Sequence, residues 1–239
     1  MVKKKSIAII LARGGSKRLP FKNILKLNKK PLIAWSIDAA ISSRQFDKVL
    51  VSTDDKKISN ISKKYKAEVP FLRSKAIDDY SSSSLATYHA LRQAEKFWGE
   101  KYEIVVQLMA NCPLRTALDI KKSIKAFKKS KAPSQISCFR FGWMNPWWAV
   151  KLNRKGKPFK IFPKSNHKRS QDLPKLYCPS GAVWMAKRNH FINKKNFYMR
   201  GHRFQEINWI SGLDIDDKDD FLMSKICFDL RNLKHKNKK

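Results

Sequence analysis

Up to about residue 130, short apolar runs alternate with longer segments in which apolar residues recur at helical spacing. Buried strands are predicted at 7–12, at 48–52, near 68–72 and at 103–108. Helices are predicted from Pro31, after the capping residues 53–55, and at 82–97 and 117–128. Strands joined through helices pair in parallel, so this alternation predicts an α/β fold with a mainly parallel sheet and helices on both faces.

The alternation stops after about residue 134. Residues 140–177 have no long helical pattern, and they hold several prolines together with Trp143, Trp147 and Trp148. We expect this stretch to project from the body of a single domain that spans 1–239. The tryptophans are expected to anchor it on the body or on a partner subunit, and stacking on single-stranded bases is the alternative. Regular order is expected again at 182–186 and 204–209, and in a last helix from about 217 to 230.

The net charge is +33, from 52 basic and 19 acidic residues. Charge of this size attracts polyanions, so a basic nucleic-acid-binding protein is one functional hypothesis. The lysines are spread along the whole chain, however, and this favours a solvated surface over a nucleic-acid footprint. The four cysteines form no C-x-x-C pair and no segment approaches a membrane span, so we expect a cytoplasmic protein with no membrane partner.

The first predicted strand leads into a basic, glycine-containing loop, RGGSKRLPFKN, at residues 13–23. Glycines let backbone N–H groups approach an anion closely, and Arg13, Lys17, Arg18 and Lys22 add positive charge. The loop matches neither of the common glycine-rich phosphate motifs. It therefore predicts either a phosphate-binding loop or an ordinary solvated basic turn.

Two carboxylates near the C-terminal end, Asp214 and Asp216, are two residues apart. In an extended segment both side chains point to the same side, and this suits a hard cation shared with substrate phosphates. The alternative is that they cap the helix that follows, a role that Asp217, Asp219 or Asp220 could also fill.

Residues 11–23, LARGGSKRLPFKN, followed by KPLI at 30–33, closely resemble the opening of acylneuraminate cytidylyltransferases, the CMP-sialic acid synthetase family. Further matches follow in the family's order: VSTD at 51–54, LR at 72–73, DYSSS at 79–83, CPLR at 112–115, QDLP at 171–174, SGA at 180–182 and LDID at 213–216. The resemblance covers most of the chain. It implies a Rossmann-like nucleotidyltransferase fold in which 140–177 form a projecting dimerisation arm of a homodimer.

The resemblance also implies an activity, the transfer of CMP from CTP to the anomeric hydroxyl of a nonulosonic acid with release of pyrophosphate. The residues that it assigns to CTP are Arg13, Ser16, Lys17, Lys22 and Asn23 for the triphosphate and Arg73, Ser81 and Ser83 for cytosine. Lys22, expected nearest the transferred phosphorus, and Arg13 are the expected catalytic residues. Arg115, Arg169 and Gln171 are assigned to the sugar acid, with Arg169 reaching the neighbouring subunit's site. Asp214 and Asp216 would hold one or two Mg²⁺ ions.

The chain departs from the family pattern at two places associated with the sugar. It has MANC at 109–112 where the family often has QPTS, and CPSG at 178–181 where the family often has RPNG. The substrate is therefore N-acetylneuraminate or a differently decorated relative, such as legionaminic or pseudaminic acid. A 3-deoxy-manno-octulosonate cytidylyltransferase is the alternative enzyme, and the residues Gly14 to Ser16 with Lys22 and Asn23 argue against it. Arg115 could instead brace its loop.

Overall fold

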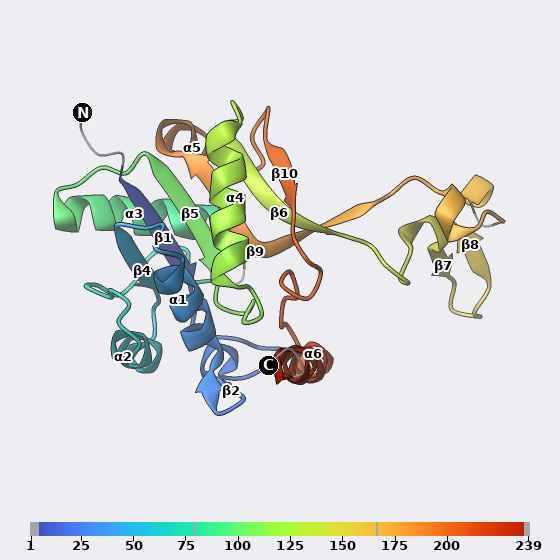
Figure 1. Ribbon diagram of the computed structural model, residues 1–239, viewed down its shortest axis with the longest axis horizontal. Coiled ribbons are helices and arrows are strands. Elements are labelled where there is room, and N and C mark those ends of the chain that lie inside the picture. The colour runs from blue at the N-terminus through green and yellow to red at the C-terminus, as the bar shows by residue number, and fades with distance from the viewer. Residues whose placement is uncertain (1–4, 79, 166, 237–239) are drawn as a thin grey trace.

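A six-stranded sheet forms the centre of the computed structural model, which describes residues 5–78, 80–165 and 167–236 (Figure 1). Its strands, in spatial order, are β10 (Arg203–Glu206), β6 (Ser134–Arg140), β9 (Tyr177–Lys187), β5 (Ile104–Met109), β1 (Ser6–Leu11) and β4 (Lys48–Ser52). The strand β1 pairs in parallel with β4 and β5, and β10 pairs in parallel with β6. Within the described part of this six-stranded sheet, only β9 runs antiparallel to its neighbours. The expected mainly parallel sheet is confirmed.

Helices cover both faces of this sheet, as expected. The helices are α1 (Leu32–Ser43), α2 (Lys56–Lys64), α3 (Ser83–Trp98), α4 (Ala117–Lys129), α5 (Arg188–Lys194) and α6 (Lys218–Lys236). Side chains of β1 alternate between the faces: Ala8 and Ile10 pack with α1, α2 and α4, whereas Ile7 and Ile9 pack with α3 and α5. A strand buried on both faces has to be apolar throughout, and this accounts for the uninterrupted run in the sequence.

Local capping fixes where several helices begin and end. The Asp55 carboxylate accepts a hydrogen bond from Ile58 N at the start of α2, and Ser82 does the same for Leu85 N at the start of α3. Thr116 and Asp119 form a reciprocal capping box at α4. Gly99 ends α3 with φ 64°, a left-handed conformation that glycine adopts without strain. The caps at the starts of α2, α3 and α4 position the loops that follow the strands, whereas Gly99 leads the chain back toward the start of β5.

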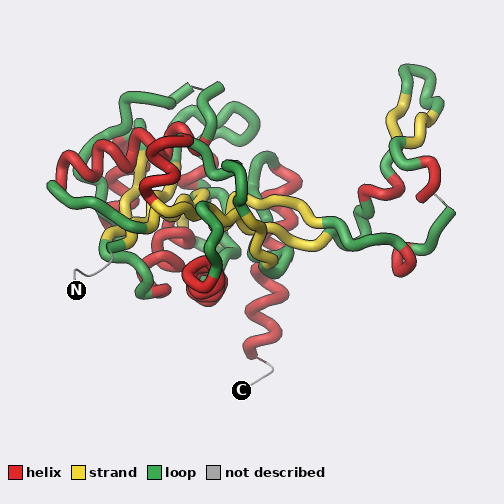
Figure 2. The backbone as a smooth tube through the Cα atoms, turned by 90° about the horizontal axis from the view of Figure 1, so that it is seen from above, coloured by secondary structure: helices red, strands yellow, loops and turns green. Residues whose placement is uncertain are grey.

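Residues 141–176 project from the body as an arm (Figures 1 and 2). The strands β6 and β9 carry it, with Arg140 paired to Tyr177 at its base. It contains a small hairpin of β7 (Val150–Leu152) and β8 (Pro158–Lys160) and the 3₁₀ turns at 146–148, 163–165 and 170–172. The ring of Trp147 packs edge-on against the ring of Phe162, with their centroids 5.0 Å apart, whereas Trp143 is 83% exposed. The projecting segment is therefore present where the sequence predicted it.

One sequence expectation about strands was wrong, and one strand was missed. The strand expected near 68–72 is reduced to one bridge between Glu68 and Leu50, because Pro70 has no N–H to extend the ladder. The strand β6 was not expected, because its buried positions include Ser134, Gln135 and Ser137. Several of their polar groups find internal partners: Ser134 Oγ donates to the Phe197 carbonyl at 2.6 Å and Gln135 Nε2 donates to the carbonyl of Ser123 at 2.9 Å, whereas Gln135 Oε1 is buried without a partner among the described residues. None of the helices in the described part of the chain combines the length and the apolar character needed to cross a membrane.

Candidate active site

The carboxyl ends of β1, β4 and β5 meet at one edge of the sheet, where ligands bind in open α/β folds. A cleft of about 260 Å³ lies at this edge. Its lining residues are Leu11, Arg13, Ser16, Arg18, Lys22, Asn23, Arg73, Ala76, Asp78, Ser81, Ser83, Ala86, Met109, Asn111 and Asp216. Residues more than 200 positions apart thus share one cavity, and most of them are polar.

The basic loop after β1 is held in a fixed shape. Gly14 N donates to Asp54 Oδ1 at 3.0 Å, Ser16 N donates to the Gly14 carbonyl at 3.0 Å, and Asn23 Nδ2 donates to the Arg13 carbonyl at 2.9 Å. A Cβ on Gly14 would lie 2.9 Å from Asp55 Oδ2 and 3.0 Å from Asp55 Cβ, so only glycine fits there. The buried Asn23 therefore braces the loop in addition to lining the cleft.

Two cations of this loop converge on one carboxylate of the last loop. Lys22 Nζ lies 2.8 Å from Asp216 Oδ1, and Arg18 Nη2 lies 2.7 Å from Asp216 Oδ2. Burial raises the pKa of Asp216, but hydrogen bonds and charge from Lys22 and Arg18 outweigh it, so the pKa lies below the usual value. Asp216 is thus anionic at neutral pH and holds both cations at the cleft.

Asp214 occupies a different environment, although it is only two residues away. Its carboxylate contacts the Cys112 thiol and accepts a hydrogen bond from Gly181 N at 3.2 Å. Burial raises the pKa of Asp214, and the hydrogen bonds from Cys112 and Gly181 oppose this in part. Asp216 contacts the same loop after β5, because Asn111 Nδ2 lies 3.3 Å from Asp216 Oδ1. The two carboxylates therefore meet adjacent residues of this loop, Asp214 at Cys112 and Asp216 at Asn111.

The residues expected to read cytosine line the same cleft. Arg73 is 5% exposed, and its backbone N–H donates to the Thr53 carbonyl at 2.7 Å. Burial lowers the pKa of its guanidinium. Ser83 Oγ accepts from Gln107 Nε2 at 3.3 Å at the start of α3. Ser81 is held by Asp78, which accepts hydrogen bonds from its N–H and its hydroxyl, each at 2.7 Å. Asp79 of the matching motif lies outside the described residues.

The cleft brings together most of the residues assigned from the sequence: Arg13, Ser16, Lys22, Asn23, Arg73, Ser81, Ser83 and Asp216. Lys17 belongs to the same loop but does not line the cleft, and Asp214 lies behind it against Cys112. Sequence reasoning did not assign Asp78 or Asn111. Asp78 carries a usable signal, because an Asp three residues before a Ser commonly closes a turn. Asn111 was marked only as part of the departing stretch 109–112, without a role of its own.

The three residues assigned to the sugar acid lie elsewhere. Arg115 is 2% exposed and its Nη1 donates to the carbonyls of Ala182 at 2.8 Å and Met109 at 3.2 Å, so it braces the loop after β5. Arg169 and Gln171 are exposed on the arm, and Arg169 pairs there with Asp172, with Nε 2.8 Å from Oδ2. The arm projects away from the body, so Arg169 does not reach the cleft of its own chain (Figure 1).

The acidic residues at the cleft fit a hard cation in chemistry. Asp214 and Asp216 offer carboxylate oxygens, and Asn111 Oδ1 is buried without a hydrogen-bond partner beside them. A Mg²⁺ ion commonly takes one or two carboxylates and completes its shell with water and substrate phosphate oxygens. Within the described residues no group of three or more His, Cys, Asp or Glu side chains is gathered for a metal.

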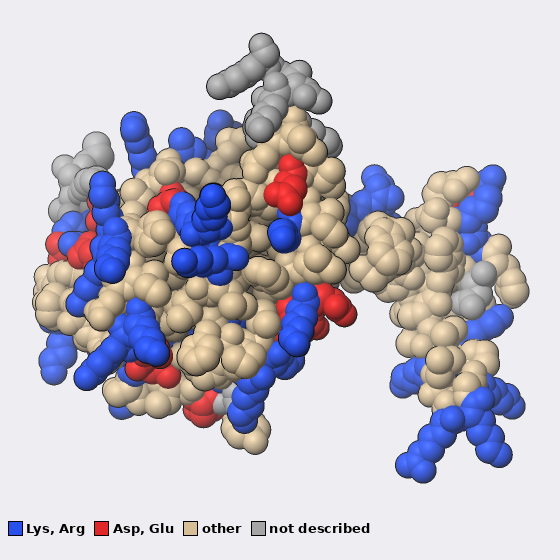
Figure 3. All heavy atoms as spheres, turned by 90° about the horizontal axis from the view of Figure 1, so that it is seen from below, with Lys and Arg blue, Asp and Glu red and all other residues tan. Residues whose placement is uncertain are grey.

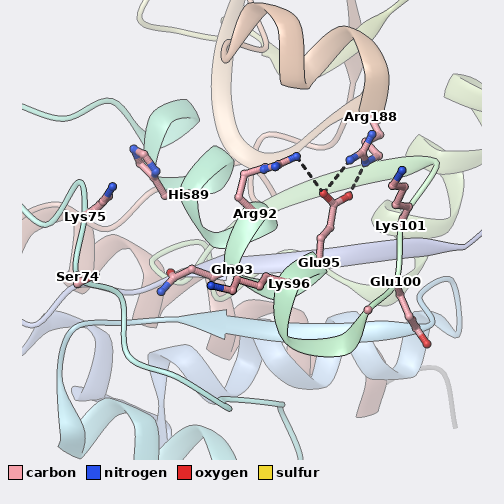
Figure 4. Close-up of a pocket in the computed structure, with 11 residues that line it drawn as sticks. Ser74, Lys75, His89, Arg92, Gln93, Glu95, Lys96, Glu100, Lys101 and Arg188 are labelled. Carbon is pink, nitrogen blue, oxygen red and sulfur yellow. Dashed lines mark hydrogen bonds and ion pairs between the residues drawn. The ribbon is translucent and has the colours of Figure 1, made fainter.

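A larger cleft of about 590 Å³ lies elsewhere, against the outer side of α3 (Figure 4). Its central carboxylate, Glu95, is held by Arg188, with Nη2 2.8 Å from Oε2, and by Arg92 at 3.7 Å. The Glu95 carboxylate is thus already paired within the chain, and none of the residues assigned from the sequence lines this cleft. Size alone does not make an active site, and the convergent polar groups favour the smaller cleft.

Comparisons with known proteins identify the family of this chain. The model of the family described as cytidylyltransferase matches residues 7–207. The chain is 32% identical over 228 residues to a pseudaminic acid cytidylyltransferase of Campylobacter jejuni, covering 94% of this chain and 96% of that protein. It is 30% identical over 234 residues to a CMP-N,N'-diacetyllegionaminic acid synthase of Legionella pneumophila, covering 94% and 96%.

An N-acylneuraminate cytidylyltransferase of Streptococcus agalactiae is 31% identical over 239 residues, which cover 98% of this chain and 56% of that protein. Among solved structures, the CMP:2-keto-3-deoxy-manno-octonic acid synthetase complexed with CTP superposes with a TM-score of 0.71 at 16% identity, over 95% of this chain and 100% of that one. At this identity the structural likeness concerns the fold alone. The family match and the first relatives settle the assignment: this chain belongs to the cytidylyltransferase family and is a nucleotidyltransferase.

Proposed function

We propose that the enzyme transfers CMP from CTP to the anomeric hydroxyl of a nonulosonic acid and releases pyrophosphate. The observation that carries this proposal is the cleft at the carboxyl edge of the sheet, which is lined both by the basic loop after β1 and by Arg73, Ser81 and Ser83. The cations of this cleft suit a triphosphate, and its small polar side chains suit the edge of a pyrimidine.

The loop after β1 is proposed to bind the triphosphate. Phosphoryl-type transfer depends on positioning and on neutralising charge more than on covalent chemistry. Arg13 and Lys22 are proposed to neutralise charge as the bond between the α-phosphorus and the departing pyrophosphate breaks. Ser16 would add a hydrogen-bond donor, and Lys17 would add a positive charge. Because Lys22 is held by Asp216, its ammonium group is already oriented at the cleft before CTP arrives.

Asp214 and Asp216 are proposed to hold Mg²⁺. When bound, the ion would offset phosphate charge during the displacement. Lys22 and Arg18 contact the two carboxylate oxygens of Asp216, and a metal bound to Asp216 would share these oxygens with them. The metal ion and the triphosphate are therefore expected to bind together. The partnerless Asn111 Oδ1 supports the same place for the ion.

The sugar acid is proposed to bind next to Asp214, and a derivative other than N-acetylneuraminate is favoured. The two stretches that depart from the sialic-acid pattern, 109–112 and 178–181, are adjacent in space: Cys112 and Gly181 both contact Asp214. A Cβ on Gly181 would lie 2.8 Å from Met109 Cγ, so the two stretches are also packed together. The named relatives that act on pseudaminic and legionaminic acids support the same choice of class.

The arm is proposed to form a homodimer in which each active site is completed by the partner. Arg169 and Gln171 are exposed on the arm and lie outside the cleft of their own chain. Exposed apolar side chains such as Trp143, Leu152 and Phe159 would be covered in such a dimer. A cytoplasmic location is proposed as well, since the described cysteines are all free.

The surface gives little support to the nucleic-acid alternative. On the face in Figure 3, Lys and Arg side chains stand at many separate places over the body, with uncharged surface between them, and others cover the arm. A nucleic-acid footprint concentrates basic residues in one stripe or patch. The octulosonate alternative is supported by the structural relative only at the level of the fold.

The test is a pyrophosphate-release assay that crosses the four nucleoside triphosphates with pseudaminic, legionaminic, N-acetylneuraminic and 3-deoxy-manno-octulosonic acids. We expect release with CTP and a nine-carbon acid and none when either substrate is omitted. Release with the eight-carbon acid alone would replace the proposed substrate class. Absence of release with every pair, together with salt-sensitive duplex binding, would favour the nucleic-acid alternative.

A further inference from the structure

The larger cleft against α3 has an excess of positive charge in its lining. Its two acidic residues are Glu95 and Glu100. Against them stand five bases, which are Lys75, Arg92, Lys96, Lys101 and Arg188. Figure 4 shows that these bases are spread along the cleft: Lys75 lies on one side, Lys101 and Arg188 lie on the other, and Arg92 lies between them. Positive charge therefore lines the cleft along its length.

Both acidic residues of this cleft are already paired. The Glu95 carboxylate is held by two of the arginines. Glu100 Oε1 lies 2.9 Å from the Nζ of Lys5, a residue that does not line the cleft. Within the described residues no carboxylate pairs with the other three bases, Lys75, Lys96 and Lys101. Their ammonium groups can therefore contact an anion that enters the cleft without first breaking an ion pair.

His89, which also lines the cleft, is affected by the same positive charge. Burial lowers the pKa of its imidazole, and the charges of Lys75 and Lys195 lower it further. Lys195 ends α5, so this charge comes from an element that adds to the five bases of the lining. A ligand with negative charge would be attracted to this place.

The lining also indicates what kind of anion fits. Ammonium and guanidinium groups bind phosphate oxygens well. A volume of about 590 Å³ exceeds what one phosphate needs, and the bases come from separate segments, so a chain of two or more phosphates matches them better. Nucleobases are commonly held by stacking on aromatic rings, and no Phe, Tyr or Trp lines this cleft. The ligand is therefore one that phosphate groups alone can anchor.

We propose that this cleft binds a small polyphosphate anion, with pyrophosphate and tripolyphosphate as representatives of the class. No residue lines both this cleft and the candidate active-site cleft, yet one segment borders the two. Ser74 and Lys75 line the larger cleft. Their neighbours Arg73 and Asp78 line the smaller one. A bound polyphosphate would thus contact the segment that carries residues of the proposed CTP site, but the inference does not depend on the proposed reaction.

The test is a calorimetric titration of the full chain with tripolyphosphate at physiological ionic strength. All titrations use a Lys22→Ala background, which weakens phosphate binding in the candidate active-site cleft. Lys75→Gln with Lys101→Gln removes two bases of the larger cleft, and Lys121→Gln with Lys125→Gln, at exposed positions of α4, is the control with the same change of net charge. We expect the first pair to weaken binding at least about tenfold and the control to weaken it less than about twofold. Absence of binding to the background chain, or equal losses in both pairs, overturns the proposal, because equal losses indicate attraction by the net charge alone.

Lysine acetylation of the parent chain, followed by mass spectrometry, tests the location without any substitution. We expect tripolyphosphate to slow the modification of Lys75 and Lys101 at least about fivefold and to leave Lys121 and Lys125 unchanged. Equal protection of all four lysines, or protection of none, overturns the proposal. Protection of Lys75 and Lys101 by a short single-stranded oligonucleotide but not by tripolyphosphate would also overturn it, in favour of a nucleic-acid contact.

Discussion

Lys22 Nζ lies 2.8 Å from Asp216 Oδ1, across 194 residues of sequence. This contact joins the basic loop after β1 to the loop before α6 and places a cation and an anion together in the cleft at the carboxyl edge of the sheet. Arg18 binds the other oxygen of the same carboxylate at 2.7 Å. The pair therefore orients Lys22 before substrate binds, and it ties the phosphate loop to the proposed metal site.

Removal of the Lys22 charge is expected to affect turnover more than binding. Lys22→Ala should lower kcat by about 10²-fold and raise the KM for CTP much less, because the charge is needed most as pyrophosphate departs. Steady-state pyrophosphate release measures both constants, and Lys26→Ala, an exposed lysine of the following strand β2 (Lys26–Leu27), is the control. An unchanged kcat with a raised KM would limit Lys22 to ground-state binding.

Neutralising the carboxylates should remove the proposed metal function. Asp214→Asn and Asp216→Asn are each expected to reduce turnover about 10²-fold with the fold intact, because an amide cannot hold the charge of a carboxylate near Mg²⁺. Rates are compared across a Mg²⁺ series with circular dichroism as the folding check. Asp219→Asn, an exposed acid in the first turn of α6, should behave as the parent chain. Near-normal rates of both site variants at ordinary Mg²⁺ would refute the metal assignment.

The close approach of Gly14 to Asp55 makes a stability prediction. Asp55 cannot move aside at low cost, because its carboxylate caps α2. Gly14→Ala should therefore lower the free energy of unfolding by about 1–3 kcal/mol. Gly15→Ala, where an added Cβ meets nothing within 4 Å, should change it by less than about 0.5 kcal/mol. Denaturant unfolding of the two variants provides the comparison, and equal losses would show that the approach of Gly14 to Asp55 does not limit the residue at position 14.

The two interpretations of Arg115 predict different defects. If it braces the loop after β5, Arg115→Lys should lower the free energy of unfolding by about 1–3 kcal/mol, because a lysine cannot replace both hydrogen bonds to the carbonyls of Ala182 and Met109. Arg200→Lys, at an exposed position, is the control. A variant of normal stability with a raised KM for the sugar acid alone would instead assign Arg115 to that substrate.

Completion of the site in trans is tested by mixing inactive chains. Arg169→Ala removes the arm residue and Asp214→Asn removes the body residue, so each variant alone should be nearly inactive. A heterodimer regains one site with both residues intact, and the mixture should recover up to about a quarter of the parent activity under random exchange. Subunit exchange is verified with differently tagged chains. A mixture that exchanges subunits and stays inactive would exclude the trans arrangement, and the cytidylyltransferase activity would be unaffected by that result.

The sequence by itself determined the layered α/β body, because strands buried on both faces must be apolar throughout and helices between them must show a regular apolar face. It also located the basic loop after β1 and the projecting segment, since glycine with basic residues and a proline-rich, tryptophan-rich stretch are local signals. Only the tertiary structure placed Asp78 under Ser81 and Asn111 beside Asp216. It also separated the environments of Asp214 and Asp216, which spacing alone had treated as equivalent. The physical reason is that burial, hydrogen bonding and charge at a site come from neighbours that are distant in the chain, and no local pattern records which neighbours will meet.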